Sequence, residues 1–363
     1  MPATTISHHG RSSRWAITGI LVAALGLSGA CGGGQPAGTA GGTAPATTAV
    51  TGAGATFPYP IYSKWFSEYH NLHPEIQINY DAIGSGGGIR QITAGTVFFG
   101  ASDGPMTDEQ LKAAPDHILH FPTVLGGDVP VYNIPGVNAT LRFTGPVLAD
   151  IFLGKITKWN DPALTKLNPG VALPATDILV VHRSDGSGTT YIWVDYLSKV
   201  SPEWKGKVGV ATSVNWPVGL GGKGNQGVSG LVQQTPGAIG YVELIYALQN
   251  HISYGEVQNS AGKFVKASVD TVTAAAAGAA ADMPADFRVS ITNAPGADAY
   301  PISSFTWMLF YQHPQDKARA KIMVDFMKWA LTAGQQYCQA LGYAPLPKNV
   351  VDMEMKALGE IQL

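Results

Sequence analysis

Residues 183–190 read RSDGSGTT and lie between Asp177–Val181, an apolar run typical of a buried strand, and Tyr191–Leu197, which has apolar residues at helical spacing. Where a strand turns into a helix, the first N–H groups of the helix are left unpaired and point to one place. These N–H groups, the nearby hydroxyls and the positive end of the helix dipole favour an anion there. Arg183 adds a planar pair of donors suited to two oxygens of one oxyanion, and Asp185 is placed to orient that pair.

Two similar turns occur earlier in the chain. Thr51–Phe57 leads into a predicted helix near Pro58, and Gly84–Gly88 separates a predicted strand at Ile76–Tyr80 from helical residues at Ile89–Ile92. An ordinary capped turn explains any one of the three, with a Ser, Thr or Asp as N-cap. Three helix N-termini directed at one small anion indicate an anion site more specifically than any single turn does. The second turn lacks the Gly-Lys-Ser/Thr that ends a Walker loop.

Strands and helices are predicted to alternate along the chain, which indicates an α/β fold. In open α/β sheets the loops at the strand ends meet at one edge, so the three turns are expected to lie together. Asp103 follows a short predicted strand at Val97–Ser102. Two further extended segments are expected at Phe121–Leu125 and Val129–Asn133, the second crossing between domains. Later helices are expected at residues 147–153, 272–281 and 316–331, and a buried strand at residues 305–311.

The composition excludes some classes of function. The chain has 363 residues, enough for two domains, of which 45% are hydrophobic and 13% are charged. With 44 glycines, this composition is typical of a secreted α/β protein with many tight turns. It contains no basic patch of the kind that nucleic acid needs, so no nucleic-acid partner is expected. No His/Asp cluster has the spacing of metal ligands, so neither a metal nor another cofactor is expected.

The first 50 residues are expected to lie outside the folded body. Residues 1–30 have two arginines, an apolar run and small residues at the end, as in a secretory signal peptide. Leu27–Cys31 is similar to a bacterial lipobox, although Ser28 stands where leucine is usual. Cys31 is therefore the expected lipidation site, with a plain signal peptide or a retained membrane helix as alternatives. Residues 31–50, rich in Gly, Ala, Thr and Pro, are expected to form a flexible linker.

Cleavage after residue 30 would change the charge and the cysteine count. It removes two of the 23 basic residues and none of the 25 acidic ones, which leaves 21 basic residues and a net charge of −4. If Cys31 is lipidated, Cys338 is the single remaining cysteine and no disulfide is possible. Cys338 is expected to be a small core residue.

Six segments, in order along the chain, carry a specific resemblance. They are Thr51–Pro58, Gly84–Gly88, Gly100–Asp103, Arg183–Thr189, Trp216–Asn225 and Pro236–Glu243. Together they resemble the periplasmic phosphate-binding proteins of high-affinity phosphate ABC transporters, and the resemblance covers nearly the whole chain from about residue 51.

This resemblance implies a two-domain, type II periplasmic-binding-protein fold of the α/β class, with the ligand in the cleft between two lobes. The expected lobes are residues 51–130 plus 300–363, a discontinuous lobe I, and residues 131–299, lobe II. The implied function is high-affinity extracytoplasmic binding of inorganic phosphate and its delivery to an ABC transporter permease, without catalysis. The expected partners are phosphate, the permease subunits and the membrane, through the lipid anchor. The protein is expected to be a monomer on the extracytoplasmic face of the cell membrane, periplasmic or at the cell surface.

The resemblance also implies which residues bind phosphate. Those expected to donate through backbone N–H or hydroxyl groups are Ala55, Thr56, Phe57, Ser85, Ser187, Gly188 and Thr189. Asp103 is expected to accept a hydrogen bond from a protonated phosphate oxygen. Arg183 is expected to pair with the anion, and Asp185 to orient Arg183.

Alternatives remain for the residues and for the function. Thr56, Ser85 and Asp103 would serve equally as helix caps, and Arg183 with Asp185 as a surface ion pair. Another tetrahedral oxyanion, namely sulfate, molybdate or arsenate, is the alternative ligand. A phosphoester hydrolase with a serine nucleophile is a further alternative, but the serines at 85 and 187 lack the Gly-x-Ser-x-Gly spacing. A signalling receptor without a transport role is the third.

Overall fold

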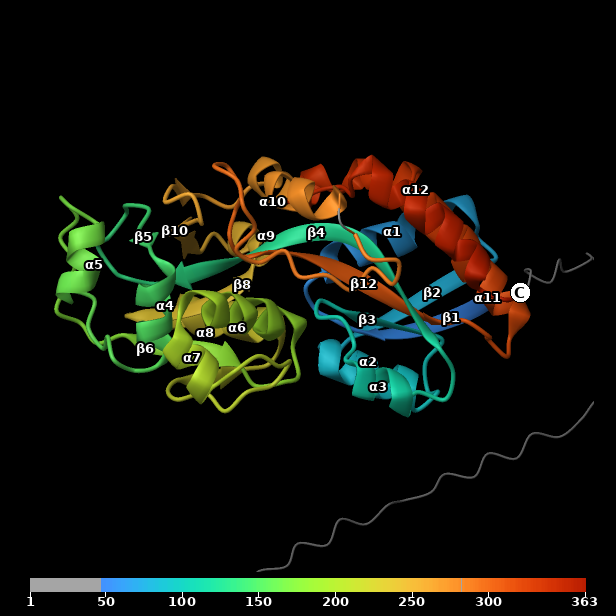
Figure 1. Ribbon diagram of the computed structural model, residues 1–363, viewed down its shortest axis with the longest axis horizontal. Helices are drawn as coiled ribbons and strands as arrows, with labels where there is room; N and C mark the ends of the chain where they lie inside the picture. The colour runs from blue at the N-terminus through green and yellow to red at the C-terminus, as the bar shows by residue number, and fades with distance from the viewer. Residues whose placement is uncertain (1–46, 282) are drawn as a thin grey trace, which may run out of the picture. The chain divides into compact units, whose positions relative to one another are not determined.

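The computed structural model describes residues 47–281 and 283–363 (Figure 1). The predicted signal peptide of residues 1–30, the predicted lipidation site Cys31 and most of the predicted linker lie outside the described residues. Within the described ranges, no helix combines the length and the apolar character needed to cross a membrane. The described residues belong to one compact unit.

A mixed sheet organises this unit. Its strands lie in the order β2-β1-β3-β12-β4-β8-β6-β7, and β9 pairs with β4 outside this path. A smaller sheet has the order β11-β10-β5. The strands are β1 Thr48–Gly54, β2 Ile76–Ala82, β3 Phe99–Ser102, β4 Ile118–Tyr132, β5 Arg142–Phe143, β6 Leu179–Arg183, β7 Leu220–Gly222, β8 Ala238–Glu243, β9 Ser253–Tyr254, β10 Glu256–Gln258, β11 Phe264–Val265 and β12 Ser303–Tyr311.

The helices connect and cover these strands. They are α1 Tyr59–Leu72, α2 Ser85–Thr93, α3 Asp108–Ala113, α4 Gly145–Phe152, α5 Pro162–Leu167, α6 Gly188–Val200, α7 Pro202–Lys207, α8 Gly224–Gln234, α9 Leu244–Gln249, α10 Val269–Ala281, α11 Lys317–Ala330 and α12 Lys348–Ala357. Three short 3₁₀ helices lie at Ala333–Tyr337, Gln339–Leu341 and Leu358–Glu360. The expected helices at residues 147–153, 272–281 and 316–331 correspond to α4, α10 and α11.

Strand β4 joins two groups of elements. Residues 118–127 of β4 pair antiparallel with β12, and residues 128–132 pair antiparallel with β8 (Figure 1). We call β1, β2, β3 and β12 with α1 and α2 the β1 half, and β6, β7 and β8 with α6, α8 and α9 the β6 half. The segments predicted to be extended at 121–125 and 129–133 are extended up to Tyr132, and they belong to one strand because the intervening residues 126–127 continue the pairing with β12.

Two other boundaries differ from the sequence prediction. The linker expected to reach residue 50 ends earlier, because Thr48–Val50 already pair with Ile76–Ile78 of β2. The glycines expected in a loop at 86–88 belong to the first turns of α2. A Cβ on Gly88 would lie 2.5 Å from the Gly54 Cα, so this glycine lets α2 pack closely on β1.

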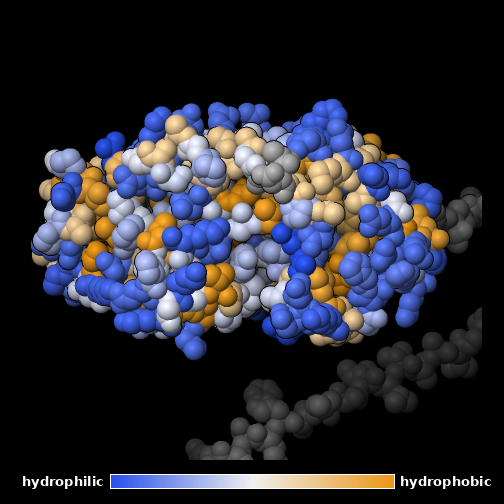
Figure 2. Space-filling model, viewed as in Figure 1, coloured by the Kyte–Doolittle hydropathy of each residue, from blue (hydrophilic) through white to orange (hydrophobic). Residues whose placement is uncertain are grey.

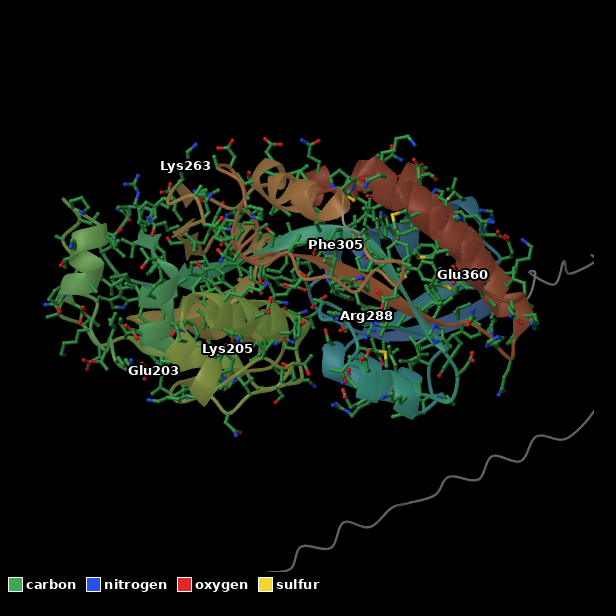
Figure 3. The ribbon with its side chains drawn as sticks, in the orientation of Figure 1. Glu203, Lys205, Lys263, Arg288, Phe305 and Glu360 are labelled. Carbon is green, nitrogen blue, oxygen red and sulfur yellow. The ribbon has the colours of Figure 1, made fainter. Side chains whose placement is uncertain are left out.

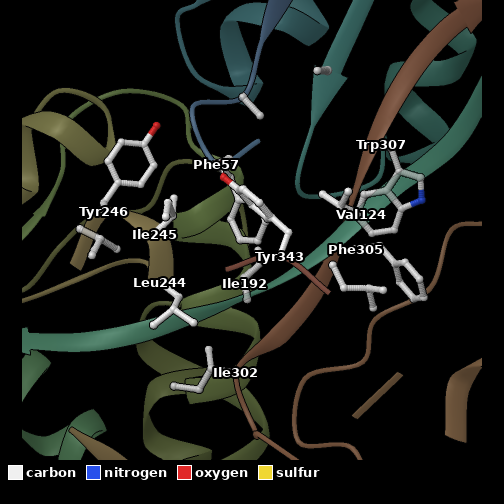
Figure 4. Close-up of a cluster of buried hydrophobic side chains, with 14 of the residues drawn as sticks. Phe57, Val124, Ile192, Leu244, Ile245, Tyr246, Ile302, Phe305, Trp307 and Tyr343 are labelled. Carbon is white, nitrogen blue, oxygen red and sulfur yellow. Dashed lines mark hydrogen bonds between the residues drawn. The ribbon is translucent and has the colours of Figure 1, made fainter. Parts of the chain in front are cut away.

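The core is rich in aromatic side chains. Figure 4 shows a buried cluster to which α6 contributes Ile192, α9 contributes Leu244, and β12 contributes Phe305 and Trp307. Cys338 is also fully buried, as expected for a small core residue. Polar residues cover much of the face seen in Figure 2, between smaller apolar patches. Arg288 (Figure 3) ties the segment after α10 to α3, because it donates at 2.8 Å to the carboxylate of Asp108.

Candidate anion-binding site

Arg183, the last residue of β6, is a buried cation with fixed partners. Its Nε donates to Oδ1 of Asp185 at 2.8 Å and its Nη2 to Oδ2 at 2.5 Å, the parallel geometry that suits a guanidinium and a carboxylate. Asp185 also accepts the backbone N–H of Gly224 at 3.0 Å. Burial acts to raise the pKa of Asp185, but the hydrogen bonds and the charge of Arg183 outweigh it and leave the pKa below its ordinary value. Asp185 therefore stays ionised and holds the guanidinium in one orientation.

The N-terminus of α6 lies beside Arg183. Ser187 is its N-cap: the Ser187 hydroxyl accepts the backbone N–H of Thr190 at 3.0 Å, while the Ser187 N–H donates to Thr212. The N–H groups of Gly188 and Thr189, the first two helical residues, have no acceptor within the helix. They remain available to an anion at the positive end of the helix.

Asp103 and Ser85 approach this helix from the β1 half. A Cβ on Gly188 would lie 2.5 Å from both the Ser85 Oγ and the Asp103 Oδ2, so only glycine fits there. The Ser85 hydroxyl accepts the backbone N–H of Asp103 at 3.2 Å. Ser85 is also the first residue of α2. Two of the segments named in the sequence, Gly84–Gly88 and Gly100–Asp103, therefore lie against a third, Arg183–Thr189.

The Asp103 carboxyl is almost completely buried and is oriented by Thr306 of β12, whose hydroxyl donates to Oδ1 at 2.7 Å. Burial raises the pKa of Asp103 to about 7, although the hydrogen bond from Thr306, the charge of Arg183 and the hydrogen bond from Ser85 act in the opposite direction. Asp103 is thus an acceptor surrounded by donors above pH 7 and becomes protonated below it.

The first turn contributes Thr56 from the β1 half. The Thr56 hydroxyl accepts two hydrogen bonds from Asn225 of α8, from the backbone N–H at 3.3 Å and from Nδ2 at 2.9 Å. The Thr56 and Phe57 carbonyls accept the hydroxyls of Tyr246 at 2.5 Å and Tyr343 at 2.6 Å. The backbone N–H groups of Thr56 and Phe57 have no acceptor in the described part of the chain.

The expectation for Ala55 was wrong. Its backbone N–H donates to the Ala101 carbonyl at 3.0 Å, as part of the packing of β1 beside β3, and is not free for an anion. The same holds for the N–H of Ser187, which leaves that residue only its hydroxyl proton to offer.

Direct contacts join the two halves at the site. The Gly86 N–H donates to the Gly186 carbonyl at 2.9 Å, and Asn225 contacts Thr56 across the same boundary. Gly84, with a φ of 88°, lies where a Cβ would fall 2.3 Å from the Asp185 carboxylate. The residues named from the sequence therefore form one connected network that spans both halves.

Three residues of this network were missed as site residues. They are Asn225, Gly224 and Thr306, which hold Thr56, Asp185 and Asp103 respectively. The segment Trp216–Asn225 contributed to the resemblance, but no pattern in it distinguishes Asn225 from its neighbours. Thr306 lies in an apolar strand, where a lone threonine is an ordinary strand residue. Only the tertiary pairing of β12 with β3 brings it near Asp103.

Metal and histidine chemistry receive no support here. Among residues 47–281 and 283–363, no group of three or more His, Cys, Asp or Glu side chains is arranged to hold a metal ion. His182 stacks on Trp216 with ring centroids 4.8 Å apart, and the Nε2 atom of His120 is bonded to the Met106 N–H at 3.1 Å.

Comparison with known proteins shows the family to which the chain belongs. A family model described as a PBP superfamily domain matches residues 39–333. The chain is 51% identical to the phosphate-binding protein PstS of Xylella fastidiosa over 303 residues, which cover 83% of this chain and 82% of the relative. The chain belongs to the PstS family of the PBP superfamily. The PstS protein of Pasteurella multocida is 49% identical to it, over 83% of this chain and 87% of the relative.

Solved structures share the PBP fold. A phosphate-binding protein from Stenotrophomonas maltophilia superposes with a TM-score of 0.67 at 21% identity, over 85% of this chain and 94% of that chain. A phosphate ABC transporter substrate-binding protein from Clostridium perfringens, solved with bound phosphate, has a TM-score of 0.61 at 19% identity, over 83% of this chain and all of that chain. The expected α/β periplasmic-binding-protein fold is confirmed.

Proposed function

We propose that this protein binds inorganic phosphate with high affinity outside the cytoplasm and delivers it to the permease of an ABC transporter. The observation that carries the proposal is the placement of Asp103, one buried acceptor, near the Arg183 charge, the Ser85 hydroxyl, which donates to Oδ2 of Asp103 at 3.5 Å, and the start of α6. Phosphate near neutral pH has a protonated oxygen for the acceptor and unprotonated oxygens for the donors. The relatives in the PstS family are named for the same ligand.

The proposed contacts come from both halves of the sheet. Donors in the β1 half are the Thr56 and Phe57 N–H groups and the hydroxyls of Thr56 and Ser85. Donors in the β6 half are Arg183, the Ser187 and Thr189 hydroxyls, and the N–H groups of Gly188 and Thr189. Fixed donors at short range outweigh the screened field of the net charge of −4 that cleavage after residue 30 would leave.

The proposal includes two lobes that close on phosphate. Lobe I would contain residues 48–130 and 300–363, and lobe II residues 131–299, with β4 crossing between them. The contacts of Gly86 with Gly186 and of Thr56 with Asn225 then belong to a closed form that phosphate stabilises by binding it better than the open form.

We further propose that the mature protein is a monomer held at the outer face of the cell membrane by a diacylated Cys31. A diacyl anchor gives stable attachment, whereas one acyl chain gives only marginal binding. Cys31→Ala should release the protein into the soluble fraction and leave phosphate affinity unchanged. Membrane attachment of Cys31→Ala after its signal peptide has been cleaved would disprove the anchor without affecting the binding proposal.

A competition experiment tests the ligand. Radiolabelled phosphate is bound to the purified protein at pH 8, and unlabelled phosphate, arsenate, sulfate and molybdate are added in turn. We expect displacement by phosphate and arsenate, which keep a protonated oxygen, and none by sulfate or molybdate at similar concentrations. The proposed function also predicts no turnover of a chromogenic phosphomonoester, because binding is not coupled to catalysis. Turnover that Ser85→Ala or Ser187→Ala abolishes would instead establish a hydrolase.

A further inference from the structure

Asn225 occupies an unusual position in the network. It is the second residue of α8, it is completely buried, and its backbone N–H, which has no acceptor inside the helix, donates to the Thr56 hydroxyl. Its side chain reaches Thr56 in the β1 half and Thr189 in the β6 half.

The orientation of the Asn225 amide is fixed by an unambiguous donor. The Glu243 backbone N–H donates to the Asn225 Oδ1 at 3.0 Å. A backbone N–H cannot accept, so the oxygen of the amide must face Glu243 and the nitrogen must face the two threonines. The two protons on Nδ2 match two acceptors, Thr56 Oγ1 at 2.9 Å and Thr189 Oγ1 at 3.1 Å.

These bonds use up the acceptor capacity of both hydroxyls. A hydroxyl has two lone pairs and one proton. Thr56 Oγ1 accepts from the N–H and the Nδ2 of Asn225, and Thr189 Oγ1 accepts from Asn225 Nδ2 and from Arg183 Nη1 at 3.2 Å. Each hydroxyl proton is therefore directed away from these partners, and the described residues offer neither proton an acceptor.

We propose that Asn225 is a positioning residue that sets the hydrogen-bond polarity of the anion site. By donating to Thr56 and Thr189 it commits both hydroxyls, one from each half, to donate to the ligand. The proposal rests on the proposed function and defines the ligand more closely. The ligand oxygens that meet these two hydroxyls must accept hydrogen bonds, as unprotonated oxygens do. Because Asp103 requires a proton from the ligand on its own side, the network as a whole selects a tetrahedral oxyanion that has at least one protonated oxygen and at least two unprotonated ones.

A double-mutant cycle tests the proposal in the purified protein. Asn225→Ala should weaken phosphate binding roughly ten- to a hundredfold, the range expected when one or two charge-assisted hydrogen bonds are lost. In the Thr56→Val/Thr189→Val background, where no hydroxyl is left to orient, the same substitution should cost less than about threefold. Ser229→Ala is the matched control, because Ser229 is buried on the same helix and its hydroxyl has no hydrogen-bond partner in the described residues. It should bind phosphate as the wild type does.

The possible outcomes separate this proposal from the proposed function. If the wild type does not bind phosphate, the proposed function fails. If the wild type binds phosphate and Asn225→Ala binds it equally well, or loses the same factor in both backgrounds, only the role of Asn225 is overturned.

A second measurement needs no variant and covers the case in which a variant fails to fold. Neutron diffraction of the perdeuterated wild-type protein crystallised with phosphate locates hydroxyl deuterons directly. We expect the hydroxyl deuterons of Thr56 and Thr189 to point at phosphate oxygens. The amide deuterons of Asn225 should point at the two threonine oxygens. Deuterons that point from either threonine to Asn225 would overturn the proposal.

Discussion

Asp128 on β4 lies directly opposite Glu243 on β8 in the antiparallel register, and both carboxyl groups are completely buried. Neither oxygen of the Asp128 carboxyl has a hydrogen-bond partner in the described residues, nor does Oε1 of Glu243. Burial raises the pKa of both groups well above their ordinary values, and the charge of nearby Asp103 acts in the same direction. Two acids thus face each other where β4 passes from β12 to β8.

This pair predicts a pH-dependent stability. A carboxyl whose pKa is raised by folding favours the folded state fully only below its ordinary pKa, and that contribution is lost as the pH rises toward the folded-state pKa. Each pKa unit of the rise corresponds to about 1.4 kcal/mol. Asp128→Asn, which is neutral at every pH, should therefore raise Tm by several degrees at pH 8 and by much less at pH 4.

Thermal unfolding at both pH values, with phosphate absent, checks this prediction. The exposed Asp81→Asn is the control and should shift Tm little at either pH. An equal gain at pH 4 and pH 8, or a loss at pH 8, would contradict a burial-raised pKa at Asp128.

A second prediction concerns the contact between Gly86 and Gly186. A Cβ on Gly86 would lie 3.0 Å from the Gly186 Cα, and the atoms it would meet belong to the backbone, which cannot move aside cheaply. Gly86→Ala should therefore weaken phosphate binding roughly tenfold by hindering closure. Stability without phosphate should not fall, because alanine has a higher helix propensity than glycine and Gly86 is the second residue of α2.

Calorimetric titration together with thermal unfolding measures both effects of Gly86→Ala. Gly278→Ala is the matched control, because it also replaces a helical glycine but places its Cβ in open space. It should leave the affinity unchanged. Wild-type affinity in Gly86→Ala would show that this contact is not part of the ligand-bound form.

The third prediction is that the particle contracts when phosphate binds. Ligand contacts from both halves favour the form in which Gly86 and Gly186 touch, so the open form is depleted. Small-angle scattering should give a smaller radius of gyration with phosphate than without it, and a smaller difference for Gly86→Ala. A radius that is the same in both states would indicate a rigid pocket.

The sequence was sufficient to predict the class of fold and most of the network, because the relevant residues lie in local strand-to-helix turns. Ser187 as a helix cap and Asp185 beside Arg183 follow from such a turn, whereas Ser85 and Asp103, 18 residues apart, were brought to one site only by the family resemblance. The helix, strand and glycine patterns that place them act over a few residues, and local patterns are what sequence reasoning detects.

The missed features depend on pairing between distant segments. Ala55 was expected to have a free N–H because the close pairing of β1 with β3 is not visible in either segment alone. Asn225 and Thr306 act through contacts that span 169 and 203 residues of sequence. The two extended segments expected at 121–125 and 129–133 belong to one strand, β4, whose continuity depends on pairing with β12 and β8.

The fourth prediction follows from the pKa of Asp103, about 7. Below that pH the carboxyl gains a proton and becomes a donor, so it no longer repels an anion that lacks one. Sulfate affinity of the wild type should therefore rise as the pH falls from 8 to 5.5. In Asp103→Asn, whose side chain does not titrate, sulfate affinity should be nearly constant over this range. A wild-type sulfate affinity that is independent of pH would mean that Asp103 does not face the ligand.

The most direct test of the account is paired calorimetric titration of the wild type and Asp103→Asn with phosphate and sulfate at pH 8. Asp103 is ionised there, accepts the phosphate proton and opposes sulfate. A site built around a ligand donor rejects an analogue without it by roughly 10⁴-fold or more. We predict one tight phosphate site and no measurable sulfate binding in the wild type, and a much smaller preference in Asp103→Asn, chiefly because sulfate is admitted. Comparable binding of sulfate and phosphate by the wild type, or an unchanged preference in Asp103→Asn, would contradict the account.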